Sequence, residues 1–123
     1  MINGAHFLLY TTDPQADRAF LRDVLGFRSV DAGEGWLIFA LPPAELAVHP
    51  SEGNLVQTHA GQPMLGATLY LMCDDLAATM TELSGKGVEC SEVEHAGWGD
   101  CTSINLPSGG HIGLYQPRHE TAI

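Results

Sequence analysis

The sequence predicts an α+β domain built from two tandem β-α-β-β-β modules, and two observations support this. An apolar run at residues 5–12 stops at an acidic residue and passes into a helical pattern, and residues 67–73 repeat that design 62 positions later. Both helical stretches end at a glycine followed by an apolar residue, Gly26-Phe27 and Gly87-Val88. A period of about 60 residues is longer than a solenoid repeat and too short for two independent domains. We therefore expect two half-domains that share one core.

The first module is expected to span about residues 4–50. Alternating side chains predict a strand at residues 6–11. Asp13 and Pro14 suit the N-cap and the first turn of a helix, and Gly26 suits its left-handed end. Three short strands are expected to follow, at residues 27–30, 36–41 and 45–49.

The second module repeats this order over about residues 67–117, after a connector at 51–66 that is rich in Gly, Ser, Pro and polar groups. A strand at 68–73 leads to a helix capped near Asp74 or Asp75. Three strands are expected near 88–93, 101–106 and 111–116, with a C-terminal tail at 118–123. Each helix would cover one face of its four-stranded sheet, and the other face would line a cavity.

Composition limits the classes of function. The chain has 123 residues, 45% of them apolar, which is enough for a single domain over residues 1–123 with a real core. Fifteen Asp and Glu against five scattered Lys and Arg argue against nucleic-acid binding. The N-terminus has no basic region and no apolar stretch reaches spanning length, so we expect a cytoplasmic protein that does not enter membranes. The low charged fraction of 16% predicts a surface buried in a homodimer.

Three cysteines without CxxC spacing, Cys73, Cys90 and Cys101, are typical of reduced and mostly buried thiols. No feature of the sequence marks one of them as a nucleophile.

Three short motifs occur in order along the duplicated scaffold. Residues 20–27, FLRDVLGF, close the first helix; Gly97-Trp98-Gly99 precedes the penultimate strand; and residues 106–110, LPSGG, form a turn. Together they resemble the vicinal oxygen chelate superfamily, which includes glyoxalase I, fosfomycin-resistance and bleomycin-resistance proteins, and extradiol dioxygenases. The resemblance covers nearly the whole chain, although the acidic residues of the family's DPDG turn are replaced. It implies that the two modules form one open, cup-like mixed-sheet barrel, the glyoxalase/bleomycin-resistance fold.

The resemblance also implies where a metal would bind. Metal-dependent members take one ligand from the first strand and one from the fourth strand of each module. In this sequence those places fall on His6 and Glu45 in module one and on Thr68 and Gly113 in module two. Thr68 is a poor ligand and Gly113 has no side chain, so only a half-site of His6 and Glu45 remains. Two protein ligands rarely hold a catalytic cation.

Two alternatives stay open at this point. The register of the strand at 45–49 is uncertain by one residue, so either Glu45 or His49 reaches the centre of the cavity. A set of His6, Glu45, His49 and His111 would then offer four ligands, in a geometry that is not the family's. In the simpler interpretation, His6 is a hydrogen-bonded cavity histidine and Glu45 is a solvated residue at the start of a strand.

The expected lining of the cavity combines tyrosines, one methionine and histidines, which suits an apolar or planar ligand with few polar anchors. Core packing is the alternative role for the same aromatic and thioether side chains. The lining residues are His6, Leu8, Tyr10, Glu45, Ala47, His49, Thr68, Tyr70, Met72, Trp98, His111, Gly113 and Tyr115.

The sequence therefore predicts a small-molecule-binding protein without a cofactor, similar to bleomycin-resistance proteins, which sequester a ligand. The acidic balance suits a cationic ligand. The alternative is a lyase, isomerase or extradiol-type dioxygenase that uses divalent Ni, Zn, Mn or Fe. It would take His6 and Glu45 as ligands and place Tyr10 or Tyr115 near the substrate. A third possibility is an interaction domain whose cavity is packed shut.

Overall fold

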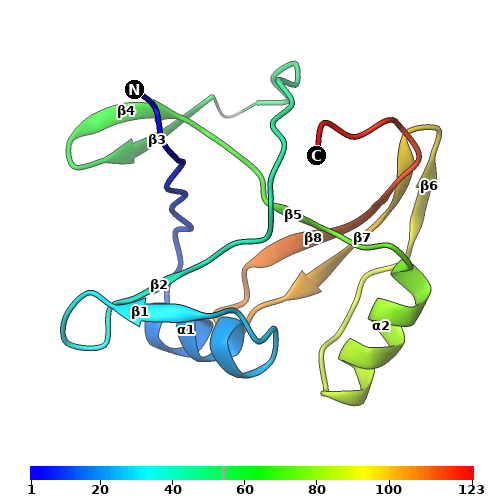
Figure 1. The fold of residues 1–123 in the computed structure, drawn as a ribbon, viewed down its shortest axis with the longest axis horizontal. Helices are drawn as coiled ribbons and strands as arrows, with labels where there is room; N and C mark the ends of the chain where they lie inside the picture. The colour runs from blue at the N-terminus through cyan, green and yellow to red at the C-terminus, as the bar shows by residue number, and fades with distance from the viewer. Residues whose placement is uncertain (54) are drawn as a thin grey trace. The chain divides into compact units, whose positions relative to one another are not determined.

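The computed structural model describes residues 1–53 and 55–123, so residue 54 of the expected connector lies outside the described residues. Within these ranges the elements follow the order α1-β1-β2-β3-β4-β5-α2-β6-β7-β8, and the predicted α+β class is confirmed (Figure 1). The chain divides into two compact units. Unit 1 comprises Met1–Ala40 and Asn105–His111, and unit 2 comprises Leu41–Ile104 and Ile112–Ile123. The expectation of a single domain over residues 1–123 stays a prediction.

Helix α1 (Pro14–Asp23) of unit 1 begins where the sequence predicts. The Asp13 carboxylate accepts the N–H of Ala16 at 3.1 Å, and Pro14 needs no hydrogen bond in the first turn. Phe20 is buried on the helix. Beyond the last turn, Gly26 has a φ of +72°, the left-handed conformation that ends helices.

An antiparallel hairpin of β1 (Ser29–Asp31) and β2 (Leu37–Phe39) follows α1 in unit 1. The Asp31 carboxylate holds its loop, accepting the N–H of Gly33 at 2.7 Å and that of Gly35 at 3.2 Å. Both glycines have positive φ values, so the loop takes a form that side chains would disfavour.

Two expected strands of the first module are not formed. Residues 6–11 and 45–49 have no regular secondary structure, and module one shows α-β-β in place of β-α-β-β-β. Their apolar side chains are exposed, to 91% at Leu46 and 93% at Val48. Alternation creates strand propensity, but a strand also needs a neighbour to satisfy its backbone groups, and the described residues supply none here.

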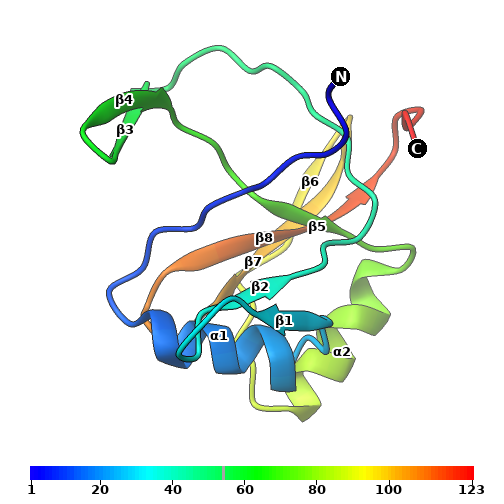
Figure 2. The same cartoon turned by 60° about the vertical axis from the view of Figure 1, so that its left-hand side comes forward.

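The expected connector contains a hairpin that the sequence analysis missed. In unit 2, β3 (Val56–His59) pairs antiparallel with β4 (Gln62–Leu65). Its two-residue turn, Ala60-Gly61, has positive φ at both positions, which is typical of tight hairpins. Figure 2 shows this hairpin, in green, as a two-stranded ribbon that projects from the chain.

Module two has the predicted β-α-β-β-β order within the sheet of unit 2 (Figure 1). The strand order is β5-β8-β7-β6, with β5 parallel to β8 and β6 antiparallel to β7. The elements are β5 (Tyr70–Met72), α2 (Leu76–Gly85), β6 (Glu94–Ala96), β7 (Gly99–Asn105) and β8 (His111–Pro117). The strand expected at 88–93 is displaced to β6, and only Cys90 of that stretch bridges to Ile104.

The two faces of β8 differ. Ile112 and Leu114 are buried on one face. Gln116 shares that face and accepts the N–H of Leu76 at 2.8 Å, which places the start of α2 there. Gly113 and Tyr115 therefore point to the opposite face. Neither helix of the described ranges is long and apolar enough to cross a membrane.

Candidate functional site

The candidate site begins with a contact between neighbouring strands of unit 2. The parallel register pairs Tyr70 of β5 with Gly113 of β8. A Cβ at position 113 would overlap Cδ1 and Cε1 of the Tyr70 ring and lie 2.8 Å from its Cγ. The ring therefore lies directly against Gly113, in space that only a glycine leaves open.

A second glycine makes room for the next ring. A Cβ on Gly99 of β7 would lie 2.5 Å from Cε2 of Tyr115. The Tyr115 ring packs edge-on to Tyr70, with centroids 6.0 Å apart, and its hydroxyl donates to the Trp98 carbonyl at 3.2 Å. Two glycines thus allow two tyrosines to lie close to the sheet.

Tyr115 is the centre of a larger aromatic group. Its ring centroid lies 5.5 Å from that of Trp98 and 5.8 Å from that of His119. Tyr70 is 46% exposed and Trp98 49% exposed, so much of their ring surface remains open to a ligand. We call Tyr70, Trp98, Tyr115 and His119 the aromatic surface.

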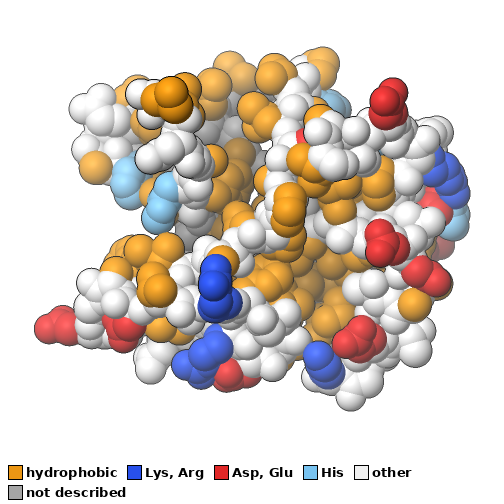
Figure 3. Space-filling model, viewed as in Figure 1, with side chains coloured by type: hydrophobic (Ala, Val, Ile, Leu, Met, Phe, Trp, Pro, Cys, Tyr) orange, Lys and Arg blue, Asp and Glu red, His pale blue; other side chains and the backbone are white. Residues whose placement is uncertain are grey.

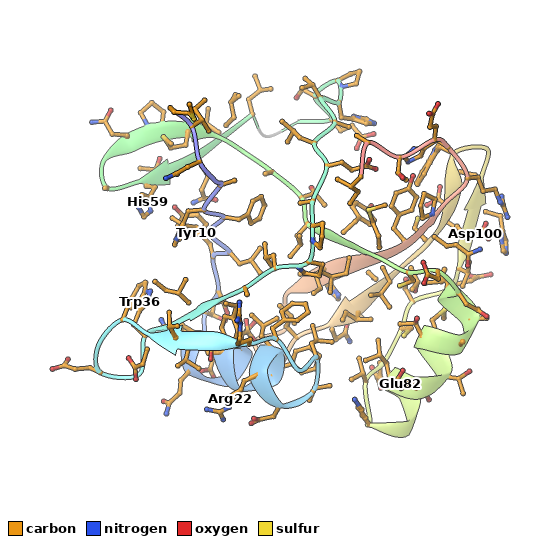
Figure 4. The ribbon with its side chains drawn as sticks, viewed as in Figure 1. Tyr10, Arg22, Trp36, His59, Glu82 and Asp100 are labelled. Carbon is orange, nitrogen blue, oxygen red and sulfur yellow. The ribbon has the colours of Figure 1, made fainter. Side chains whose placement is uncertain are left out.

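The C-terminal tail is tied to this surface by charged groups. Arg118 donates to the Asp100 carboxylate at 2.8 Å and to the Ala96 carbonyl at 3.0 Å. Asp100, labelled in Figure 4, also lies 2.7 Å from Nδ1 of His95. Together these bonds hold the residue before His119 against β6 and β7.

Glu45 also contacts the tail. Its Oε2 accepts the N–H of Ala122 at 2.7 Å, and its Oε1 lies 3.9 Å from Nε2 of His119. One of the two predicted metal ligands is therefore engaged by the tail, beside the aromatic surface.

Acidic side chains surround the two tyrosines and give this region a negative electrostatic potential. Burial raises the pKa of Tyr70, and Cys101, Glu94 and Glu52 raise it further. Burial likewise raises the pKa of Tyr115, with Glu45 and Cys101 adding to the effect. Unit 2 carries ten Asp and Glu but only Lys86 and Arg118 as basic residues. Acidic side chains spread over the α2 side of the molecule in Figure 3. Such a field favours cationic ligands.

The structure brings together part of the predicted lining. Tyr70, Trp98, Gly113 and Tyr115 form one cluster, and Met72 lies two residues from Tyr70 on the same strand. Three further predicted residues of unit 2 lie on irregular backbone: Thr68, Ala47 and His49, the last with Nδ1 2.7 Å from the Pro50 carbonyl.

Four residues of the predicted lining belong to unit 1: His6, Leu8, Tyr10 and His111. All four are exposed. Tyr10 borders a cavity of about 480 Å³ together with Thr12 and the turn at 108–110. Their place in the predicted lining stays a prediction.

The donor set of module two does not fit a metal ion. Thr68 offers only a hydroxyl, and the space beside Gly113 is filled by the Tyr70 ring. Within residues 1–53 and 55–123, no group of three or more His, Cys, Asp or Glu side chains is arranged to hold a metal. His6 and Glu45 are therefore the only family ligand places that carry suitable side chains.

The predicted lining does not include His119, which the structure places beside Tyr115. The sequence did contain an indication of its position. If the alternation of β8 continues past the end of the strand, residues 113, 115, 117 and 119 point to the same face. Asp100 and Arg118 are separated by 18 residues and gave no comparable signal.

Comparison with known proteins yields one family match. The model of the Glyoxalase/Bleomycin resistance protein/Dioxygenase superfamily matches residues 4–113. No curated protein matches the chain significantly.

Several solved structures are similar over most of their length. TnmS3, an antibiotic binding protein from Streptomyces sp. CB03234, is 25% identical, with 95% of this chain and 98% of that chain covered and a TM-score of 0.62. A glyoxalase/bleomycin resistance protein from the same organism is 25% identical, with 86% and 93% covered and a TM-score of 0.53. Lactoylglutathione lyase from Agrobacterium tumefaciens is 20% identical, with 88% of each chain covered and a TM-score of 0.57, a likeness of fold alone.

Proposed function

The chain belongs to the Glyoxalase/Bleomycin resistance protein/Dioxygenase superfamily, and within it we propose a protein that binds a planar, cationic organic molecule without transforming it. The aromatic surface of unit 2 is the proposed site. The observation that carries this proposal is the Tyr70 ring lying across Gly113, because an aromatic face then stands where metal-dependent members place a ligand side chain.

The chemistry of the surface supports a planar cation. The exposed faces of Tyr70 and Trp98 offer π-electron density to a stacked ring, and each cation–π contact is worth about 0.5–2 kcal/mol. The carboxylates of Glu94 and Glu45, which raise the tyrosine pKa values, attract positive charge to the same place.

The similarity to TnmS3, described as an antibiotic binding protein, supports binding as the activity. The rival function is a lyase, isomerase or dioxygenase that uses a divalent metal held by His6 and Glu45. Its support is that these two places keep ligand side chains, and its weakness is that Glu45 already accepts the Ala122 N–H. We propose no cofactor.

We also propose that two copies of the chain associate. Leu46, Val48 and Leu65 are 91%, 93% and 84% exposed, and exposed apolar surface of this kind marks interaction sites. The segment at 45–49 has the alternation of a strand without a pairing strand, which a second copy would supply. Light scattering after gel filtration should give twice the chain mass, and Leu46→Lys should lower it. A monomer at high concentration would contradict this.

The binding test uses three probes that differ in charge at one ring system. N-methylquinolinium, quinoline and quinoline-2-carboxylate at pH 7.5 are cationic, neutral and anionic, respectively. We expect the cation to quench the fluorescence of a Trp36→Phe protein, in which Trp98 is the one tryptophan, at the lowest concentration. Tyr70→Leu should weaken it about tenfold, the equivalent of one cation–π contact. Tyr10→Leu, an exposed tyrosine of unit 1, is the matched control and should change nothing. Equal affinity for the three probes, or equal loss in both variants, would refute the proposal.

The metal-dependent alternative is tested by measuring how much metal the purified protein contains. We expect protein purified without chelator to contain no stoichiometric Ni, Zn, Mn or Fe. Stoichiometric metal that disappears in His6→Ala and in Glu45→Gln would replace the binding proposal by the metal-dependent one.

A further inference from the structure

A second candidate site lies in unit 1, between helix α1 and the β1–β2 hairpin. A cavity of about 280 Å³ opens there, close to the lower limit of cavities that hold small ligands. Its polar walls are Gln15, Arg18, Arg22 and Asp31, while Ala19 and Leu37 supply apolar surface. Figure 4 shows Arg22 on the helix and Trp36 on the hairpin, and Figure 3 shows basic side chains in blue near α1.

The Arg18 guanidinium is held in place by an aromatic ring but makes no ion pair with the described residues. Its guanidinium carbon lies 4.6 Å from the ring centroid of Trp36, so the hairpin holds the group by a cation–π contact. Among the described residues, no hydrogen bond or ion pair involves the Arg18 guanidinium. A half-buried guanidinium held by its face keeps its edge of N–H donors for another molecule.

Arg22 stands one helical turn after Arg18, on the same side of α1. Its Nε and Nη2 donate to Asp23 at 2.7 and 2.8 Å, which leaves Nη1 outside this pair. The nearby acid, Asp31, faces the backbone N–H groups of Gly33 and Gly35. Its carboxylate is therefore engaged by the hairpin loop, and Arg18 is the cavity arginine whose charge no carboxylate of the described residues pairs.

We propose that this cavity binds a small organic anion, a carboxylate carried on a planar ring. The planar fork of Arg18 matches the two oxygens of a carboxylate, and Nη1 of Arg22 can add a third donor. Ala19 and Leu37 provide the apolar surface that the ring needs. This site is independent of the proposed function, because it lies in the other unit and selects the opposite charge.

The test observes the Trp36 indole N–H by NMR in a Trp98→Phe background, where only one tryptophan remains. Benzoate, acetate, benzyl alcohol and inorganic phosphate are the probes. We expect benzoate to shift the indole signal with a dissociation constant near 1 mM, and the other three to bind at least about fivefold more weakly, because each lacks the ring or the carboxylate. Phosphate or acetate binding as tightly as benzoate would overturn the proposal, since the ring would then contribute nothing.

Variants locate the site. Arg18→Gln should weaken benzoate about tenfold, and Arg18→Lys, which keeps the charge but loses the fork, should weaken it about threefold. Arg28→Gln is the matched control, an exposed arginine of unit 1 outside the cavity lining, and should bind within twofold of the parent. If Arg28→Gln and Arg18→Gln lose affinity equally, the effect is one of general charge and the site is refuted. A positive or negative result here leaves the quinolinium experiment on Trp98 unaffected.

Discussion

Replacing Gly113 by alanine tests the contact on which the candidate site depends. In an ordinary strand, the change from glycine to alanine stabilises a protein by about 0.5–1 kcal/mol, because the unfolded chain loses freedom. At Gly113 the new methyl group would overlap the Tyr70 ring, and ordinary carbon contacts of about 3.5–4.0 Å require the ring to move by roughly 1.5 Å. The backbone is held in place, since the Gly113 N–H donates to the Leu69 carbonyl at 2.9 Å.

Because of this overlap, Gly113→Ala should lower the free energy of unfolding and not raise it. Overpacking costs about 1–3 kcal/mol, so we expect a net loss of about 1–2 kcal/mol and a melting temperature about 4–8 °C lower. Circular dichroism measures the melting, and the near-ultraviolet band follows the displaced tyrosines. Gly97→Ala is the control within unit 2, since no described atom lies within 4 Å of its Cβ, and it should melt within about 2 °C of the parent.

A double variant separates the contact from a general effect on the strand. In a Tyr70→Ala background the ring is gone, and Gly113→Ala should no longer destabilise. An unchanged melting temperature for Gly113→Ala alone, or an equal loss in both backgrounds, would refute the reasoning.

Two further predictions concern groups that are buried or half-buried. Asp17 is 6% exposed and accepts the Thr11 hydroxyl at 2.5 Å and the Ser108 N–H at 3.0 Å, so Asp17→Ala should lower the free energy of unfolding in urea by about 2 kcal/mol. The exposed Asp23→Ala should leave the urea midpoint unchanged, and equal midpoints for the two variants would contradict the assignment. Burial raises the pKa of the Cys90 thiol, and burial together with Glu94 and Asp100 raises that of Cys101. Both thiols should react with a disulfide reagent more slowly than unfolded chain at pH ~8. Because the unfolded chain then releases these protons first, stability should fall as pH rises above about 8.5, and equal stability at pH ~7.5 and ~10 would refute this.

The helix ends could be predicted from the sequence because they depend on residues next to one another in the chain. Asp13 and Gly26 mark the ends of the first helical segment because capping depends on adjacent residues. Residues 6–11 and 45–49 carry the alternation of strands, but alternation does not specify a pairing strand. The β3–β4 hairpin was missed because its turn begins at Ala60, a residue that rarely adopts positive φ.

Three of the four residues of the aromatic surface were predictable from the sequence, but their arrangement was not. Tyr70, Trp98 and Tyr115 were expected to line a cavity because they share strand parity or a loop beside it. That Tyr70 covers Gly113 depends on the parallel register of β5 and β8, which pairs residues 43 positions apart. A pattern within one strand contains no information about that register.

Module one keeps side chains that can bind a metal at both family ligand places, and module two does not. The contact at Gly113 changes how this difference is understood. From the sequence alone it is a lost ligand, and a single substitution to an acidic residue would restore a carboxylate to module two. In the structure that place is taken by the Tyr70 ring, and a larger side chain would meet the overlap that alanine already meets. A carboxylate therefore requires the ring to leave as well, so two substitutions are needed where the sequence indicates one. Such coupled changes separate the aromatic surface from a metal site more firmly than the absence of one side chain does. This coupling is the physical reason for treating module two as a binding surface.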